Sequence, residues 1–200
     1  QMRHLIDNYI DAEESRKVSS FGDLTLVDLV IKSGISTMIN NLPEKTRKNQ
    51  TTSAETVESN VRKTLSEERP KDPEFFDKMS ILLDELILER KKDASKYEQY
   101  LKDIEKLCKD IGNHFADEKF PKNINTKTRK VLYNNLENNE NLVVKLDESI
   151  LKNKPEGWKG HMIKEKMVKQ IIEETLKKEN IDDPDLVQKI LDLAINQDEY

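Results

Sequence analysis

Positively charged side chains gather in two stretches of the sequence, where they could contact phosphate groups. Residues 119–136 contain five basic side chains and no acidic one, and residues 152–169 contain six lysines against two glutamates. Each contact between such a cation and a phosphate adds affinity that falls as the salt concentration rises. The candidate contacts for DNA or for a protein partner are Lys119, Lys122, Lys127, Arg129, Lys130, Trp158, Lys159, Lys164, Lys166 and Lys169.

A second interpretation of these charges needs no ligand. Residues 170–200 contain nine acidic and three basic side chains, so the basic stretches could pair with this acidic end of the chain or simply be solvated. Exposed charge pairs contribute little free energy, and isolated lysines specify little. The G-x-x-G at Gly157–Gly160 matches the loop of a KH domain, but no neighbouring sheet is predicted to support it. Both interpretations stay open on the sequence alone.

Residues that could perform catalysis or hold a cofactor are hard to find. The sequence has no G-x-x-x-x-G-K-[ST], G-x-S-x-G, H-E-x-x-H or C-x-x-C pattern. His4, His114 and His161 are scattered along the chain, and we interpret each as a polar surface or loop residue. The aspartates at 182–185 lack the glycine and distal glutamate of a calcium loop, so we interpret them as a helix cap. We therefore predict no catalytic, cofactor-binding or metal-binding residue in this chain.

The elements that must position these side chains are helices, and the clearest two form a hairpin over about residues 72–112. Asp72 can cap the first helix, with Pro73 at its first position. Ser95 and Glu98 have the spacing of a capping box for the second helix. Apolar residues recur three or four apart in both segments, which predicts two stripes that pack on each other.

Shorter amphipathic segments surround the hairpin. We expect helices over residues 23–34, 35–41, 52–68, 126–136, 142–151, 162–176 and 183–195. Asp23 is the predicted cap of the first of these, and Thr52 with Glu55 the predicted capping box of the third. The third helix has a thin apolar stripe and is predicted to lie on the surface, whereas residues 44–50 are predicted to be a loop. The apolar positions of the long helix near the end are Met162, Met167, Val168, Ile171, Ile172 and Leu176.

The predicted class is all-α, because no pair of alternating strands with a turn between them is found. We expect an irregular multi-helix domain built around the hairpin, with a smaller C-terminal helical part. The predicted division is a linker over residues 1–22, a helical domain over 23–112 and a C-terminal helical subdomain over 113–200.

Composition limits the class of protein further. Charged residues make up 36 % of the chain, against about 25 % in typical domains, which favours many exposed helix faces. The net charge of −5 does not by itself indicate a nucleic-acid binder. No stretch approaches the ~20 apolar residues of a membrane helix. Cys108, the single cysteine, lies on an apolar stripe and is predicted to be a core residue in a reducing, cytoplasmic compartment.

Seven phrases occur in a fixed order along the chain. They are LIDNYIDAEESRKVSSFGDLTLVDLVIKSG, ETVESNVRKTL, DPEFFDKMSILLDELILERK, YEQYLKDI, NTKTRKVLYNNL, EGWKG and KEKMVKQII. In this order they resemble the C-terminal region of the R (motor) subunit of type I restriction enzymes, and the resemblance covers almost the whole chain.

The resemblance implies a longer parent protein. That parent is an ATP-dependent type I site-specific deoxyribonuclease, a hydrolase that uses ATP and Mg²⁺ in nuclease and motor domains absent from this sequence. The catalytic residues of those domains have no matching positions here, and residues 1–22 would correspond to the exit from the second motor domain. In the family, the helical C-terminal region is associated with docking onto the methyltransferase core, and specificity belongs to another subunit.

Three hypotheses follow. The first is a non-catalytic assembly module that docks the ATP-dependent translocase and endonuclease onto the methyltransferase and specificity subunits. The alternative is a helical element that contacts DNA through the basic segments 119–130 and 159–169. The third, that this chain is itself an enzyme, has almost no support in the sequence.

Overall fold

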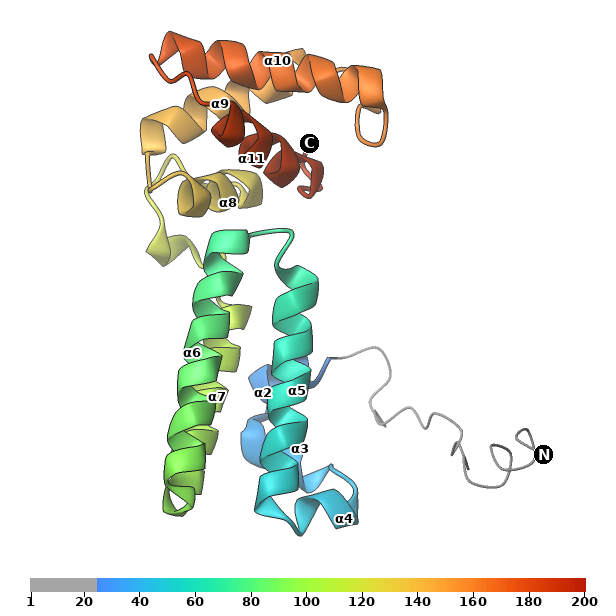
Figure 1. Cartoon of the computed structure of the whole chain (residues 1–200), viewed down its shortest axis with the longest axis vertical. Coiled ribbons are helices and arrows are strands. Elements are labelled where there is room, and N and C mark those ends of the chain that lie inside the picture. The colour runs from blue at the N-terminus through green and yellow to red at the C-terminus, as the bar shows by residue number, and fades with distance from the viewer. Residues whose placement is uncertain (1–24) are drawn as a thin grey trace, which may run out of the picture.

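The computed structural model describes residues 25–200, which form ten α-helices and two short 3₁₀ segments, with no strand in this part of the chain. The predicted all-α class is therefore confirmed. The predicted linker at 1–22 and the predicted cap Asp23 lie outside the described residues. Figure 1 shows two groups of helices, one below and one above, which we name the N-terminal lobe (residues 25–112) and the C-terminal lobe (residues 124–200).

Each lobe has its own hydrophobic core. The last buried residue of the first core is Cys108, and the first of the second core is Ile124. The connection at 113–123 contains one short 3₁₀ segment, η2 (Asp117–Lys119). The N-terminal lobe contains α2 (Leu26–Ser33), α3 (Ile35–Asn40), α4 (Glu44–Arg47), α5 (Gln50–Glu68), α6 (Pro73–Lys92), η1 (Ala94–Lys96) and α7 (Tyr97–Gly112). The C-terminal lobe contains α8 (Lys127–Asn135), α9 (Glu140–Asn153), α10 (Met162–Lys178) and α11 (Pro184–Ile195).

The predicted hairpin is formed by α6 and α7, which pack against each other. Asp72 caps α6 as predicted, because its carboxylate accepts a hydrogen bond from the Phe75 backbone N–H (3.3 Å). The predicted capping box at Ser95 is wrong. Both the N–H and the hydroxyl of Ser95 donate to Asp93 Oδ1 (3.0 and 2.6 Å), so α7 begins two residues later, without a side-chain cap.

Helix α5 is more buried than its thin apolar stripe predicts. Val57, Val61 and Leu65 are fully buried, and the small residue Ala54 extends the same face. The helix packs on α6 and α2 through this face, while the opposite side, with Arg62 and Lys63, is exposed. Its cap is Asn49 rather than the predicted Thr52, because α4 occupies most of the predicted loop and brings the chain into the helix earlier.

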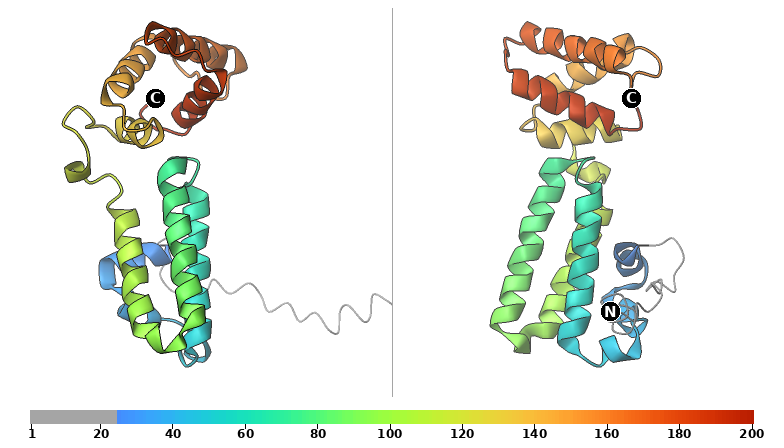
Figure 2. Two further views of the ribbon diagram at one scale, coloured as in Figure 1. Left: turned by 60° about the vertical axis from the view of Figure 1, so that its left-hand side comes forward. Right: turned by 45° about the vertical axis from the view of Figure 1, so that its right-hand side comes forward.

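A buried polar cluster joins the two lobes. The Asp72 carboxylate accepts hydrogen bonds from the side-chain amides of Asn134 and Asn135 on α8 (both 2.7 Å). His114 Nε2 lies 2.8 Å from the same carboxylate, and its ring stacks on Phe75 with centroids 3.6 Å apart. His114 lies in the connecting loop, as one of the two predicted alternatives has it, but it is buried in the joint rather than on the surface. Figure 2 shows the beginning of α6 meeting the C-terminal lobe at this point.

Candidate functional site

The C-terminal lobe is built on the antiparallel pair α9 and α10. Lys145 on α9 pairs with Glu179, just after α10 (2.7 Å). Further along the pair, the hydroxyl oxygens of Thr175 and Ser149 lie 3.0 Å apart, within hydrogen-bond distance. The lobe also contains most of the residues predicted to contact DNA or a partner.

Three predicted contacts in the first basic stretch, Lys119, Lys122 and Lys127, are exposed. Arg129 instead takes part in a buried arrangement. Its Nε donates to Asp147 Oδ2 (2.6 Å), and the Tyr200 hydroxyl donates to Asp147 Oδ1 (2.9 Å). Burial and the neighbouring Asp147 carboxylate raise the pKa of the Tyr200 hydroxyl well above its usual value. Arg129 thus holds α8, α9 and the end of the chain together.

Lys130 is also part of the fold rather than of the surface. Its ammonium group donates to the Phe115 carbonyl oxygen (2.7 Å) and pairs with Asp117 Oδ1 (2.5 Å). Both partners lie in the connection between the lobes. The side chain is buried, so Lys130 fixes the connection on α8 and does not present its charge to solvent.

The predicted contacts around the 157–160 turn are likewise held by partners within the fold. Trp158 is buried in the core, and its indole N–H donates to the Tyr200 carbonyl oxygen (3.2 Å). Lys159 donates to the Gln197 carbonyl oxygen, and burial lowers the pKa of its ammonium group. Lys164 donates to the Glu156 carbonyl oxygen (2.7 Å). The turn is therefore a folded anchor of the lobe, with positive φ at both of its glycines.

The last two predicted contacts lie on α10. Lys166 is exposed, whereas Lys169 donates to the side chain of Gln188 (2.6 Å). In Figure 1 the connection at 113–123 lies at the left of the C-terminal lobe, and the turn before α10 lies at the right. The two stretches nevertheless approach each other at the end of the chain, because the Lys127 backbone N–H donates to Glu199 (3.3 Å) and Lys159 donates to the Gln197 carbonyl oxygen.

Sequence reasoning missed a groove between α9 and α10, with a volume of about 390 Å³. Its lining side chains are Ser149, Asn153, Met167, Gln170, Ile171, Glu174, Thr175 and Lys178. Ile163, one turn before Met167, is 64 % exposed, and Met167 itself is 50 % exposed. A volume of this size lies within the range of small-ligand and side-chain binding clefts.

The apolar positions predicted for α10 therefore do not all face the core. Val168, Ile172 and Leu176 are buried and form one face, but Met162 and Met167 are exposed, as is Ile163. Apolar residues spread around a helix more widely than one buried face requires are the sequence signal for such a surface. Local spacing alone does not say which of them a neighbouring helix covers.

The described residues give no sign of a metal centre or a membrane span. Residues 25–200 contain no group of three His, Cys, Asp or Glu side chains that could hold a metal ion. Within the same residues, no helix combines the length and the apolar character needed to cross a membrane.

Comparisons with known proteins add no relative: no protein-family model, curated protein or solved structure matches this chain. A proposal for its function therefore rests on the geometry of the C-terminal lobe together with the resemblance in the sequence.

Proposed function

We propose that this chain is a non-catalytic assembly module of a type I restriction enzyme. It docks the ATP-dependent translocase and endonuclease subunit onto the core formed by the methyltransferase and specificity subunits, in the cytoplasm. The observation that supports docking is the exposed apolar pair Ile163 and Met167 beside the α9–α10 groove. Apolar side chains gathered beside a concave surface are typical of protein interfaces. The identity of the partner comes from the sequence resemblance.

A binding measurement with purified methyltransferase core tests this proposal. The 200-residue chain is titrated into the core at low and high salt, with and without DNA. We expect binding without DNA, weakened at most about tenfold by salt, because burial of apolar surface is not screened. Six or more phosphate contacts would instead lose about 1,000-fold or more over a similar salt range. The proposal fails if the folded chain does not bind the core.

The alternative function is direct contact with DNA. The exposed Lys119, Lys122 and Lys127 favour it, because they lie within nine residues of each other. We expect the double variant Lys122→Glu/Lys127→Glu to abolish any salt-dependent DNA binding of the chain while leaving its fold intact. Arg129 and Lys130 are unsuitable for this test, since their pairs with Asp147 and Asp117 are structural. DNA binding that is absent, or insensitive to salt, would count against the alternative.

A further inference from the structure

We propose that the N-terminus of α8 is a binding site for a phosphate group with at least three free oxygens, in the place where the Glu199 carboxylate lies in the structure. Such a group is inorganic phosphate or the terminal phosphate of a nucleic-acid strand, and the same donors would recognise both. The inference goes beyond the docking function and does not depend on it. Three observations support it: two backbone N–H groups that already hold an anion, a buried hydroxyl without a partner, and lysines from both basic stretches.

The first two backbone N–H groups of α8 hold the carboxylate of Glu199. The Lys127 N–H donates to Oε1 (3.3 Å), and the Thr128 N–H donates to Oε2 (2.9 Å). The local cap uses neither of them, because the Thr126 hydroxyl oxygen accepts from the Arg129 N–H (3.2 Å). The first N–H groups of a helix have no acceptor in that helix, and the helix dipole favours negative charge there. This end of α8 therefore binds an anion supplied by a residue 71 positions further along the chain than Thr128.

The Thr128 hydroxyl is a donor that this carboxylate leaves unused. Thr128 is 1 % exposed, and its Oγ1 has no hydrogen-bond partner among the described residues. Burial would raise the pKa of the Glu199 carboxyl, but the surrounding N–H and hydroxyl donors, those of Thr128 first, lower it. The Thr128 hydroxyl thus faces the carboxylate without making a hydrogen bond of regular geometry. A buried hydroxyl in this state costs free energy, and a ligand that accepts from it removes the cost.

A phosphate matches these donors better than a carboxylate does. The carboxylate has two oxygens, and each of them already accepts from one N–H group. A terminal phosphate has three acceptor oxygens in a tetrahedral arrangement, so it can accept from both N–H groups and also from the Thr128 hydroxyl. An internal phosphate of a nucleic-acid backbone has only two such oxygens, like the carboxylate. The unused hydroxyl therefore favours a terminal phosphate over an internal one.

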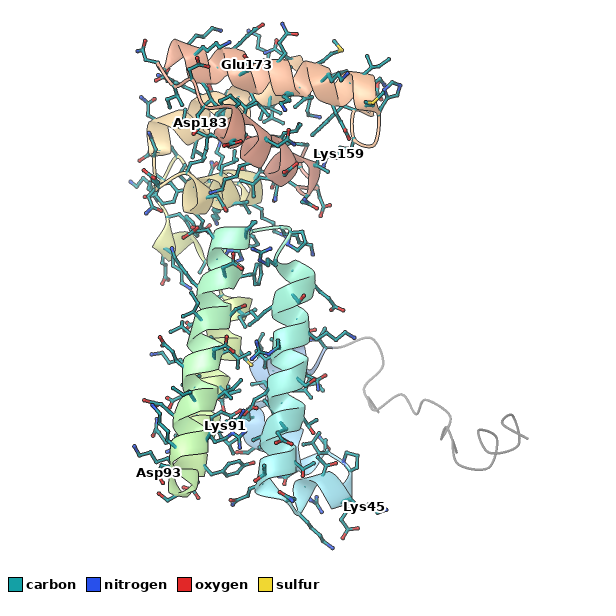
Figure 3. All side chains as sticks on the ribbon, in the orientation of Figure 1. Lys45, Lys91, Asp93, Lys159, Glu173 and Asp183 are labelled. Atoms are coloured by element: carbon teal, nitrogen blue, oxygen red, sulfur yellow. The ribbon has the colours of Figure 1, made fainter. Side chains whose placement is uncertain are left out.

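Lysines from both basic stretches contact the segment that carries Glu199. Lys127 is the first residue of α8, and its side chain is exposed. Lys159 donates to the carbonyl oxygen of Gln197, two residues before Glu199. Figure 3 shows Lys159 beside the end of α11. Phosphate near pH 7 carries more negative charge than one carboxylate, so it gains more from these two cations.

Glu199 can leave the N–H groups without disturbing the lobe. The backbone on either side of it is fixed by buried side chains: the Gln197 amide donates to the Lys71 carbonyl oxygen (2.8 Å), and the Tyr200 hydroxyl donates to Asp147 (2.9 Å). The side chain of Glu199 itself is exposed. Exposed side chains change rotamer within nanoseconds. Exchange of the carboxylate for a phosphate therefore needs only a side-chain rotation.

A titration with inorganic phosphate at constant ionic strength tests this site. The backbone amide signals of Lys127 and Thr128 are followed by NMR in the 200-residue chain. We expect both signals to shift, and Glu199→Gln to raise the apparent affinity about tenfold, because a neutral amide competes less well than a carboxylate. Asp198→Asn is the matched control: it removes the same charge from the adjacent exposed residue and should change the affinity less than about threefold.

A second comparison tests the buried hydroxyl. In the Glu199→Gln background, Thr128→Val keeps the shape of the side chain and removes its donor. We expect the affinity for phosphate to fall about fivefold. Thr175→Val removes a buried hydroxyl on α10 instead and should leave the affinity unchanged. Circular dichroism checks that each variant is folded. Equal affinities of the Thr128→Val variant and its background would contradict the assignment of this hydroxyl to the phosphate.

A third comparison identifies the source of the phosphate. The Glu199→Gln chain is titrated with one DNA oligonucleotide that ends in either a 5′-phosphate or a 5′-hydroxyl. Tighter binding of the 5′-phosphate form than of inorganic phosphate supports a DNA end as the ligand, and the reverse supports a small anion. The inference is overturned if neither probe shifts the Lys127 and Thr128 signals, if Asp198→Asn raises the affinity as much as Glu199→Gln does, or if the two oligonucleotides bind equally well at these residues and inorganic phosphate does not bind. None of these measurements involves the methyltransferase core, so their failure leaves the docking proposal untouched.

Discussion

Each lobe buries a carboxylate that accepts hydrogen bonds from an arginine and a tyrosine. The two arginines differ in the other partners that they have. In the N-terminal lobe, Glu58 Oε1 accepts hydrogen bonds from Arg90 Nε (2.8 Å) and from the Tyr100 hydroxyl (2.9 Å). In the C-terminal lobe, Arg129 and Tyr200 donate to different oxygens of Asp147. Each lobe therefore closes its core with a carboxylate held between an arginine and a tyrosine.

The difference lies in the arginines. Arg90 is 9 % exposed, and its Nη2 has no hydrogen-bond partner among the described residues. Arg129 is 17 % exposed, donates to the Asn123 carbonyl oxygen (3.0 Å) and lies 3.6 Å from Glu148. A buried charge that loses its only carboxylate destabilises a fold more than a charge that keeps a second one. Arg90 therefore depends on Glu58 as its carboxylate partner, whereas Arg129 would keep Glu148 as a second carboxylate if Asp147 were removed.

The largest effect is therefore expected for Glu58→Ala. It leaves Arg90 buried without a carboxylate, and we expect a loss of about 3–5 kcal/mol in the free energy of unfolding, measured by urea denaturation. The double variant Glu58→Leu/Arg90→Met should recover only part of this loss, because apolar groups replace the pair while the Tyr100 hydroxyl still lacks its acceptor. Equal stability of Glu58→Ala and the unmodified chain would contradict the role assigned to this pair.

The next largest effect tests the joint between the lobes. Asp72→Ala removes the acceptor of Asn134 and Asn135 as well as the cap of α6, so we expect a loss of about 3 kcal/mol. Asp183 is the matched control: it also precedes a proline and caps a helix, α11, but it is exposed. Asp183→Ala should cost only about 1 kcal/mol. Similar losses for the two variants in urea denaturation would mean that Asp72 acts as a cap alone.

A smaller effect is expected for Asp147→Ala in the C-terminal lobe. In this variant Arg129 keeps its contact with Glu148 and remains partly exposed to solvent. The free energy of unfolding should therefore fall by about 2 kcal/mol, because the Tyr200 hydroxyl loses its acceptor and Arg129 is less well paired. The same urea denaturation measures it. A loss equal to or greater than that of Glu58→Ala would break the proposed difference between the lobes.

The smallest effect concerns the cysteine of the N-terminal lobe. Burial, together with the nearby Glu105 carboxylate, raises the pKa of the Cys108 thiol to about 12. Because a raised pKa keeps the thiol protonated at pH 8, we expect almost no alkylation of the folded chain by iodoacetamide at that pH. Mass spectrometry measures the reaction, with the urea-unfolded chain as the positive control. Rapid alkylation of the folded chain would show that this core opens readily.

Local sequence signals predict much of the fold. The caps at Asp72 and at the aspartates 182–185 were predicted, because a cap such as Asp72 or Asp183 bonds to backbone N–H groups two or three residues away. The core position of Cys108 was predicted from its place on an apolar stripe and is confirmed. These features depend on neighbours along the chain, which the sequence displays directly.

Contacts between distant residues could not be predicted in the same way. Glu58 and Arg90 are 32 residues apart, and Asp72 and Asn135 are 63 apart. Arg129 was predicted to contact DNA or a partner, and His114 to be a surface or loop residue, because a single polar residue does not reveal its distant partner. Their burial follows from how the helices pack, which decides whether a charge meets a partner or water.

The candidate site was predictable only in part. The apolar residues of α10 were visible in the sequence, but their division between the core face and the exposed face depends on where α9 and α11 pack. The same holds for the lysines: the sequence locates them, and the fold decides that Lys130 is buried and Lys166 is exposed.

Hydrogen–deuterium exchange of the chain, alone and with the methyltransferase core, tests the central claim most directly. Without DNA, the account predicts slower exchange on binding in the last turn of α9 and the first half of α10, which bear Asn153 and Met167. It predicts no change around Ile81 on α6. Protection of α6 with α10 unchanged, or protection of α10 only when DNA is added, would contradict docking through the α9–α10 groove.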